Sequence, residues 1–174
     1  KKKFILGESE RYYYRDSQNE PYKYNFSIKS CHYNKESDLF IKAIMILIEK
    51  MNHLKLSFFH LLEEKESCIS VKKMNDVIYH YTINDENHTI GNLLQNHISR
   101  RCIDDKSMFL LCGYKKTHPL EEIIQLIISI NPNHEIMKKK EITKYQEITN
   151  AIISELEVLK QQLKELLKVA NDTF

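Results

Sequence analysis

The chain has 174 residues, of which 42% are hydrophobic and 29% charged, so it has enough apolar side chains to fold around a core and is not a disordered chain. Its formal net charge of +2 argues against the broad cationic surface of a general nucleic-acid binder. The four cysteines stand far apart, without a C-x-x-C pair, which argues against a zinc knuckle and favours a reducing compartment. No apolar run approaches the roughly 20 residues of a membrane span. Because the sequence begins Lys-Lys-Lys rather than with Met, we expect a fragment, or the ordered part, of a longer protein.

The first third of the chain predicts a strand and then a long helix. Tyr24, Phe26 and Ile28 alternate with polar residues, as in a half-buried strand. From Glu36 to about Glu64 there is neither Gly nor Pro, and apolar residues recur at steps of four and three, which predicts a helix that packs on another helix. The stripe consists of Phe40, Ile44, Leu47, Met51, Leu54, Phe58 and Leu61, widened by Ile41, Met45 and Ile48 in its first half, so we expect that end to be buried deeper.

The middle of the chain predicts a β-hairpin and a short helix. Residues 68–73 and 77–83 alternate around the polar turn 74–76. A helix should then run from about Thr89, as N-cap, to Arg101. Gly91 lies in its first turn, where glycine costs up to about 1 kcal/mol relative to alanine. We therefore expect a backbone or a side chain to approach closely at Gly91.

Two further strands and a long helix complete the pattern. Strands are expected at 108–115 and 121–130, and the second is apolar on both faces, so it should need cover on both sides. A final helix of about 50 Å should run from about Lys139 to Asn171. Its stripe includes Ile152, Leu156, Leu159, Leu163 and Leu166, and its expected partner is the helix at 36–64.

Two sequence motifs in this part of the chain carry a family resemblance. The run E-N-H-T-I-G-N-L-L resembles the dimerisation signature E-D-H-T-L-G-N-x-L of the small α-like subunits of cellular RNA polymerases, the archaeal L subunit and the eleventh subunit of polymerase II. It differs at Asn87 and Ile90. A second segment is similar to the family's G-Y-x-x-x-H-P-L-E. The residues that carry the resemblance are Glu86, His88, Thr89, Ile90, Gly91, Asn92, Leu93 and Leu94, and then Gly113, Tyr114, His118, Pro119, Leu120 and Glu121.

The region before the hairpin is similar to a different member of the same family. Residues 24–30 and the helix after them look like the C-terminal part of the larger α-like partner, the archaeal D subunit or the third subunit of polymerase II, with Lys29 in place of an acidic residue. The resemblance implies two α-like parts joined covalently, 1–66 from the larger partner and 67–174 as a complete smaller one. Single-chain fusions of this kind occur in large DNA viruses. The implied fold is α+β, an antiparallel four-stranded sheet with a motif helix and a long C-terminal helix in the order ββαββα, preceded by a strand and a long helix of the partner half.

The resemblance also implies a function. It predicts a non-catalytic assembly-platform subunit of a DNA-directed RNA polymerase, which scaffolds the two large catalytic subunits and binds small zinc-binding subunits, and meets DNA only through the complex. No cofactor, small-molecule substrate or membrane is implied. At the interface, Gly91 would let a partner approach, and Ile90, Leu93 and Leu94 would supply apolar contact. A viral protein would be found in the cytoplasmic viral factory or the virion, and a cellular one in the nucleus.

Other interpretations are weaker. His88 and His118 lack metal-ligand spacing and are expected to be structural, and the pairs Asp85-Glu86 and Asp104-Asp105 lack a third converging carboxylate, so no catalytic or metal site is predicted. Basic residues at Arg100-Arg101 and 138–140 are expected to be solvated helix ends rather than nucleic-acid contacts. The alternative function is a free-standing, helix-paired homodimeric interaction module of another complex, and an enzyme ranks third.

Overall fold

The computed structural model describes residues 14–15, 17, 21–23, 27–31, 35–103 and 107–173. The chain divides into two compact units, Lys1–Phe40 and Ile41–Phe174. In the first unit β1 (Tyr14–Arg15) and β2 (Pro21–Lys23) pair in antiparallel fashion. The centre of the strand expected around residues 24–28, at Tyr24 to Phe26, lies outside the described residues. This division separates two parts of the chain that each make most of their contacts internally. It does not test the boundary that we predicted at residue 66 between the two family halves, which stays a prediction.

The second unit contains an antiparallel four-stranded sheet, as predicted. The strands are β3 (Ile69–Lys73), β4 (Ile78–Asn84), β5 (Phe109–Lys116) and β6 (Ile123–Ile130), in the spatial order β3-β4-β6-β5. Between β4 and β5 lie α3 (His88–Ser99) and the 3₁₀ turn η2 (Arg100–Ile103), and after β6 come η3 (Glu135–Lys138) and α4 (Glu141–Thr173). This order is ββαββα, and α2 (Glu36–Leu62) precedes it.

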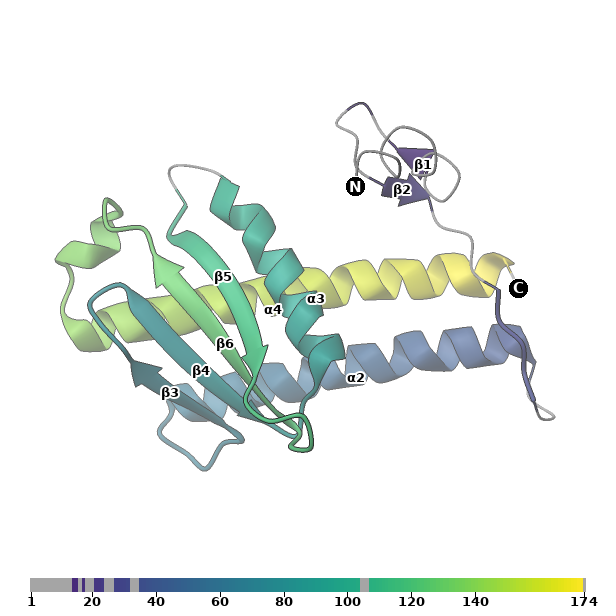
Figure 1. Cartoon of the computed structure of the whole chain (residues 1–174), viewed down its shortest axis with the longest axis horizontal. Helices are drawn as coiled ribbons and strands as arrows, with labels where there is room; N and C mark the ends of the chain where they lie inside the picture. The colour runs from purple at the N-terminus through teal and green to yellow at the C-terminus, as the bar shows by residue number, and fades with distance from the viewer. Residues whose placement is uncertain are drawn as a thin grey trace. The chain divides into compact units, whose positions relative to one another are not determined.

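One face of the sheet makes the core. Alternate residues of β4 and β6 are buried on this face against α2, α3 and α4, and in Figure 1 the strands pass in front of α2 and α4. The buried strand residues are Tyr79, Tyr81 and Ile83 on β4 and Ile124, Leu126, Ile128 and Ile130 on β6. The expectation that β6 is covered on both sides is not met within the described chain, because Ile123 and Ile127 on the opposite face stay partly exposed.

Helices α2 and α4 pair in antiparallel orientation, which confirms the predicted helix pairing. The Nζ of Lys55 lies 2.7 Å from Oε2 of Glu157, and the hydroxyl of Tyr145 donates to the carbonyl oxygen of Leu61 at 3.4 Å. The predicted stripe residues Ile44, Met51, Leu54, Ile152, Leu156, Leu159 and Leu163 are buried, and Leu47 is partly buried against the core.

The far end of this helix pair differs from the prediction. Leu166 is 45% exposed and Met45 is 54% exposed, so the end that we expected to be buried deeper is the more open one. Figure 1 shows why: the two helices run on past the sheet, and there each helix has the other as its neighbour in the second unit. A single neighbouring helix covers a narrower stripe than a helix and a sheet together.

Helix α3 also begins earlier than predicted. Its N-cap is Asn87, whose Oδ1 accepts the backbone N–H of Thr89 at 3.0 Å. Thr89 is therefore the second residue of the helix and not its cap. Asparagine is among the strongest N-cap residues, and its extended backbone here (φ −130°) leaves the side chain free to accept that bond.

Candidate interaction site

The two family-like motifs meet at Gly91. A Cβ atom on Gly91 would lie 2.4 Å from Cδ2 and 2.7 Å from Cε2 of Tyr114 on β5, so the ring fills the place where any other side chain would begin. The Tyr114 hydroxyl lies 3.2 Å from Nδ1 of His88, and the two rings meet edge to face with centroids 5.8 Å apart. We call Gly91, Tyr114 and His88 the motif cluster. The close approach of a side chain predicted at Gly91 is confirmed, and within this chain the neighbour is Tyr114; the approach of a partner subunit at Gly91 stays a prediction.

Side chains of α3 also hold the edge of the sheet. The N–H of Tyr114 donates to Oε1 of Gln95 at 3.2 Å, and the hydroxyl of Ser99 donates to the carbonyl oxygen of Cys112 at 3.3 Å. These bonds satisfy backbone groups of β5 that an edge strand otherwise exposes. Sequence reasoning missed Gln95 and Ser99, although their spacing of four residues places them on one face of the helix.

A buried carboxylate joins the motif to α2. Glu86 is 6% exposed, its Oε2 lies 2.8 Å from Nζ of Lys50 on α2, and its N–H donates to the carbonyl oxygen of Glu122 at 3.1 Å. A carboxylate so far removed from water needs such a partner, because an unpaired buried charge is costly. Lys50 was not predicted, since nothing in the helical pattern separates it from the other lysines of that helix.

The apolar residues of the motif are already covered within the chain. Ile90 is fully buried and Leu94 is 2% exposed, both in the core, and Leu93 is partly buried against it. Thr89 and Asn92 are exposed, and Asn92 accepts a bond from Nδ2 of Asn96 at 3.0 Å. A shallow hollow of about 300 Å³ separates α2 from the start of α3, lined by Ala43, Ile46, Leu47, Lys50, Asn87, Thr89 and Ile90.

The second motif continues into an exposed turn. Nδ1 of His118 accepts the N–H of Leu120 at 3.2 Å, and Nζ of Lys116 donates to the carbonyl oxygen of Pro119 at 2.8 Å. His118 is thus a turn-forming residue, as expected. Leu120 itself is 89% exposed, and Pro119 and Glu121 are exposed beside it. A large apolar side chain held outward on an ordered turn is a candidate contact for a partner.

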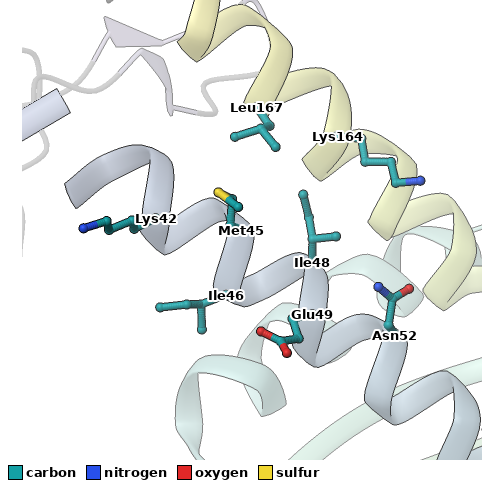
Figure 2. A pocket seen from close by; sticks show the side chains of 8 residues that line it. All are labelled: Lys42, Met45, Ile46, Ile48, Glu49, Asn52, Lys164 and Leu167. Carbon is teal, nitrogen blue, oxygen red and sulfur yellow. The ribbon is translucent and has the colours of Figure 1, made fainter. Parts of the chain in front are cut away.

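A larger apolar groove lies between α2 and α4. It has a volume of about 530 Å³, and Figure 2 shows Met45, Ile48 and Leu167 pointing toward one another across it. Lys42 and Lys164 stand at its sides, together with Glu49. The groove is lined by Lys42, Met45, Ile46, Ile48, Glu49, Asn52, Lys164 and Leu167. Its apolar surface and open shape fit a partner side chain or helix better than a small polar ligand.

The described residues contain no group of three or more His, Cys, Asp or Glu side chains that could hold a metal ion. Within the same described part, no helix is long and apolar enough to cross a bilayer.

A comparison with family models agrees with this arrangement. Residues 79–173 match the model of the RNA polymerase Rpb3/Rpb11 dimerisation domain. The match covers more than half of the 174 residues and runs from β4 to the end of α4, so it contains both motifs and the Gly91–Tyr114 contact, while α2 precedes it. The chain belongs to the Rpb3/Rpb11 dimerisation-domain family and is an α-like assembly subunit of RNA polymerase.

Proposed function

We propose that this chain is a covalently fused α-type heterodimer, which serves as the platform on which the two large catalytic subunits of a DNA-directed RNA polymerase assemble. In this proposal residues 1–66 derive from the larger α-like partner and 67–174 are the smaller partner. The observation that carries the proposal is that α2, which lies before the matched family domain, completes the core of that domain.

The contribution of α2 to this core is large. Met51, Leu54 and Phe58 are at most 1% exposed, and the ring centroid of Phe58 lies 5.8 Å from that of Tyr81 on β4. Burying three such side chains contributes roughly 5–8 kcal/mol by the transfer scale. A helix that a partner subunit would otherwise supply is thus joined to the domain by a loop of a few residues, which makes the association intramolecular and independent of concentration.

The family and the exposed surface support the proposed partners. The proposal assigns the groove between α2 and α4 and the Leu120 turn to contacts with other polymerase subunits, which we take to include the two large catalytic subunits and the small zinc-binding subunits. DNA would be reached only through the complex. We further propose a large DNA virus as the source, with the protein in the cytoplasmic viral factory or the virion; a cellular source would place it in the nucleus.

Affinity purification of the natural full-length protein from its source, followed by mass spectrometry of stoichiometric partners, tests the polymerase assignment. Recovery of two large chains that carry nucleotidyl-transfer activity and co-purify in equal amounts with this protein would support the platform role. Recovery of the protein alone as a homodimer would refute the platform role and support the free-standing interaction module instead.

Controlled cleavage tests the role of the covalent link. A protease site placed in the loop at residues 63–66 allows the folded chain to be cut between α2 and β3. We expect both fragments to remain bound at high concentration and to separate on dilution, with polymerase assembly falling in parallel, while the uncut chain assembles at every dilution. Equal assembly by cut and uncut chains at low concentration would show that the link has no such role.

A further inference from the structure

The side of the sheet that faces away from the helices has its own composition. Its residues alternate with the buried ones, and the strand register places them in rows. One row is Lys72, His80, Ile127 and Gly113, and the next is Ser70, Thr82, Gln125 and Lys115. We call these eight residues, with Ile78, Ile123, Leu111 and Ser129, the outer face.

The outer face carries positive charge, and its own strands supply no carboxylate. None of the four described strands contains Asp or Glu. Lys72 and Lys115 lie on either side of His80, and partial burial, followed by the charges of these two lysines, lowers the pKa of the His80 imidazole. Neither lysine forms an ion pair with any residue of the described part of the chain, whereas Lys73, which points to the other face, is paired with Asp76 and Glu141.

The outer face also carries apolar residues, Ile127 in a central row and Ile78, Leu111 and Ile123 in the rows at its ends. Ile78, Ile123 and Ile127 are partly exposed and Leu111 is 57% exposed. Beside Ile127, Gly113 leaves a gap, since a Cβ built on it meets nothing within 4 Å. Partly exposed isoleucines on the outward side of a central strand, as at Ile123 and Ile127 of β6, favour cover by a further element or a partner. Here that cover is not supplied by the described residues.

A partner segment would bind across the face of the sheet and not along the β5 edge. An added strand would need free backbone groups on β5, but Gln95 and Ser99 already bind the N–H of Tyr114 and the carbonyl of Cys112. The surface therefore fits a segment that lies across the strands. With two lysines that form no ion pair within the described chain and no Phe, Tyr or Trp in its rows, it offers too few phosphate contacts and no broad stacking platform for a nucleic acid.

We propose that the outer face binds an acidic segment of a partner polypeptide, with its carboxylates at Lys72 and Lys115 and an apolar side chain over Ile127 in the gap at Gly113. The inference rests on the proposed function only for the identity of the complex in which that polypeptide is found.

Photo-crosslinking in the natural complex tests the proposal. The full-length protein carries a benzoylphenylalanine at position 129 or, as a second position on the same face, at position 70, which leaves the gap at Gly113 open, and is purified from its source after irradiation. We expect a crosslink to a segment with net negative charge, identified by mass spectrometry. Lys72→Glu with Lys115→Glu should lower the crosslink yield about fivefold or more, and Lys72→Arg with Lys115→Arg should retain it.

The control has the same charge change outside the sheet. Lys140→Glu with Lys168→Glu alters two exposed lysines at the start and end of α4, and should leave the crosslink unchanged. A crosslink at neither position, to nucleic acid, or to a segment without net negative charge would overturn the proposal. If polymerase subunits are absent but the crosslinked segment is acidic and charge-dependent, the inference stands and the proposed function fails.

Discussion

Replacing Gly91 with alanine tests whether the motif glycine serves the chain's own fold. The new Cβ would lie 2.4 Å from Cδ2 of Tyr114, whereas carbon atoms pack best at about 3.5–4.0 Å, so the ring must retreat by roughly 1 Å. Tyr114 is held in its position, because its hydroxyl is hydrogen-bonded to His88 and its backbone N–H donates to Gln95.

The expected cost is the difference of two terms. Overpacking of this kind costs about 1–3 kcal/mol, and alanine regains about 1 kcal/mol of helix propensity over glycine. We expect Gly91→Ala to lower the free energy of unfolding by up to about 2 kcal/mol, which for a chain of this size lowers Tm by up to roughly 4–8 °C. Urea unfolding followed by far-UV circular dichroism measures this difference.

Two comparisons make the measurement specific. Gly113→Ala places a methyl group in open space on β5, so it should leave stability unchanged or raise it by up to about 1 kcal/mol. In a Tyr114→Ala background the penalty of Gly91→Ala should disappear. If Gly91→Ala stabilised the chain, or cost the same with and without the tyrosine ring, the close-packing argument would be wrong.

Three further substitutions have distinct expected outcomes. Lys50→Met leaves the buried carboxylate of Glu86 unpaired and should cost about 1–3 kcal/mol in urea unfolding, more than Glu86→Gln, and the reverse order would contradict the buried ion pair. Tyr81→Phe removes the hydrogen bond between its buried hydroxyl and Oγ1 of Thr149 at 3.1 Å and should lower the free energy of unfolding by about 1–2 kcal/mol. The double variant Tyr81→Phe with Thr149→Val should have a free energy of unfolding closer to the native value. Equal costs for the single and the double variant would mean that the bond contributes nothing. Leu120→Asp, at a side chain that is 89% exposed, should leave Tm within about 1 °C and reduce recovery of the polymerase subunits in affinity purification, and full recovery would remove Leu120 from the interface.

The elements of the fold could be predicted from the sequence because they rest on periodicity. The alternation in β4 and β6 reappears as alternating burial, and the heptad stripe of α2 became buried at Met51 and Leu54. Such patterns report which side of an element faces apolar neighbours. They do not report where the neighbours end, which is why Met45 and Leu166, beyond the sheet, were expected to be buried and are exposed.

The contacts within the site could be predicted only in part. The cost of glycine in a helical turn correctly indicated a close approach at Gly91, but the identity of the approaching group depends on a strand some twenty residues away. The pairing of Glu86 with Lys50 joins residues 36 positions apart and has no local signal. The cap at Asn87 was missed because asparagine and threonine are both good N-cap residues. Asn87 and Thr89 are two positions apart, and the sequence pattern alone does not show at which of them the helix begins.

The placement of the motif residues changes where the partner surface should be sought. Ile90, Gly91 and Leu94 are buried inside the chain, so substitutions there would act on assembly through folding. The motif packs α3 on the chain's own sheet and so identifies the fold. Contact with other subunits requires side chains that are exposed to solvent. Met45 in the α2–α4 groove and Leu120 on its turn meet that condition. Variants at these exposed positions, and not in the motif, should therefore separate loss of assembly from loss of stability.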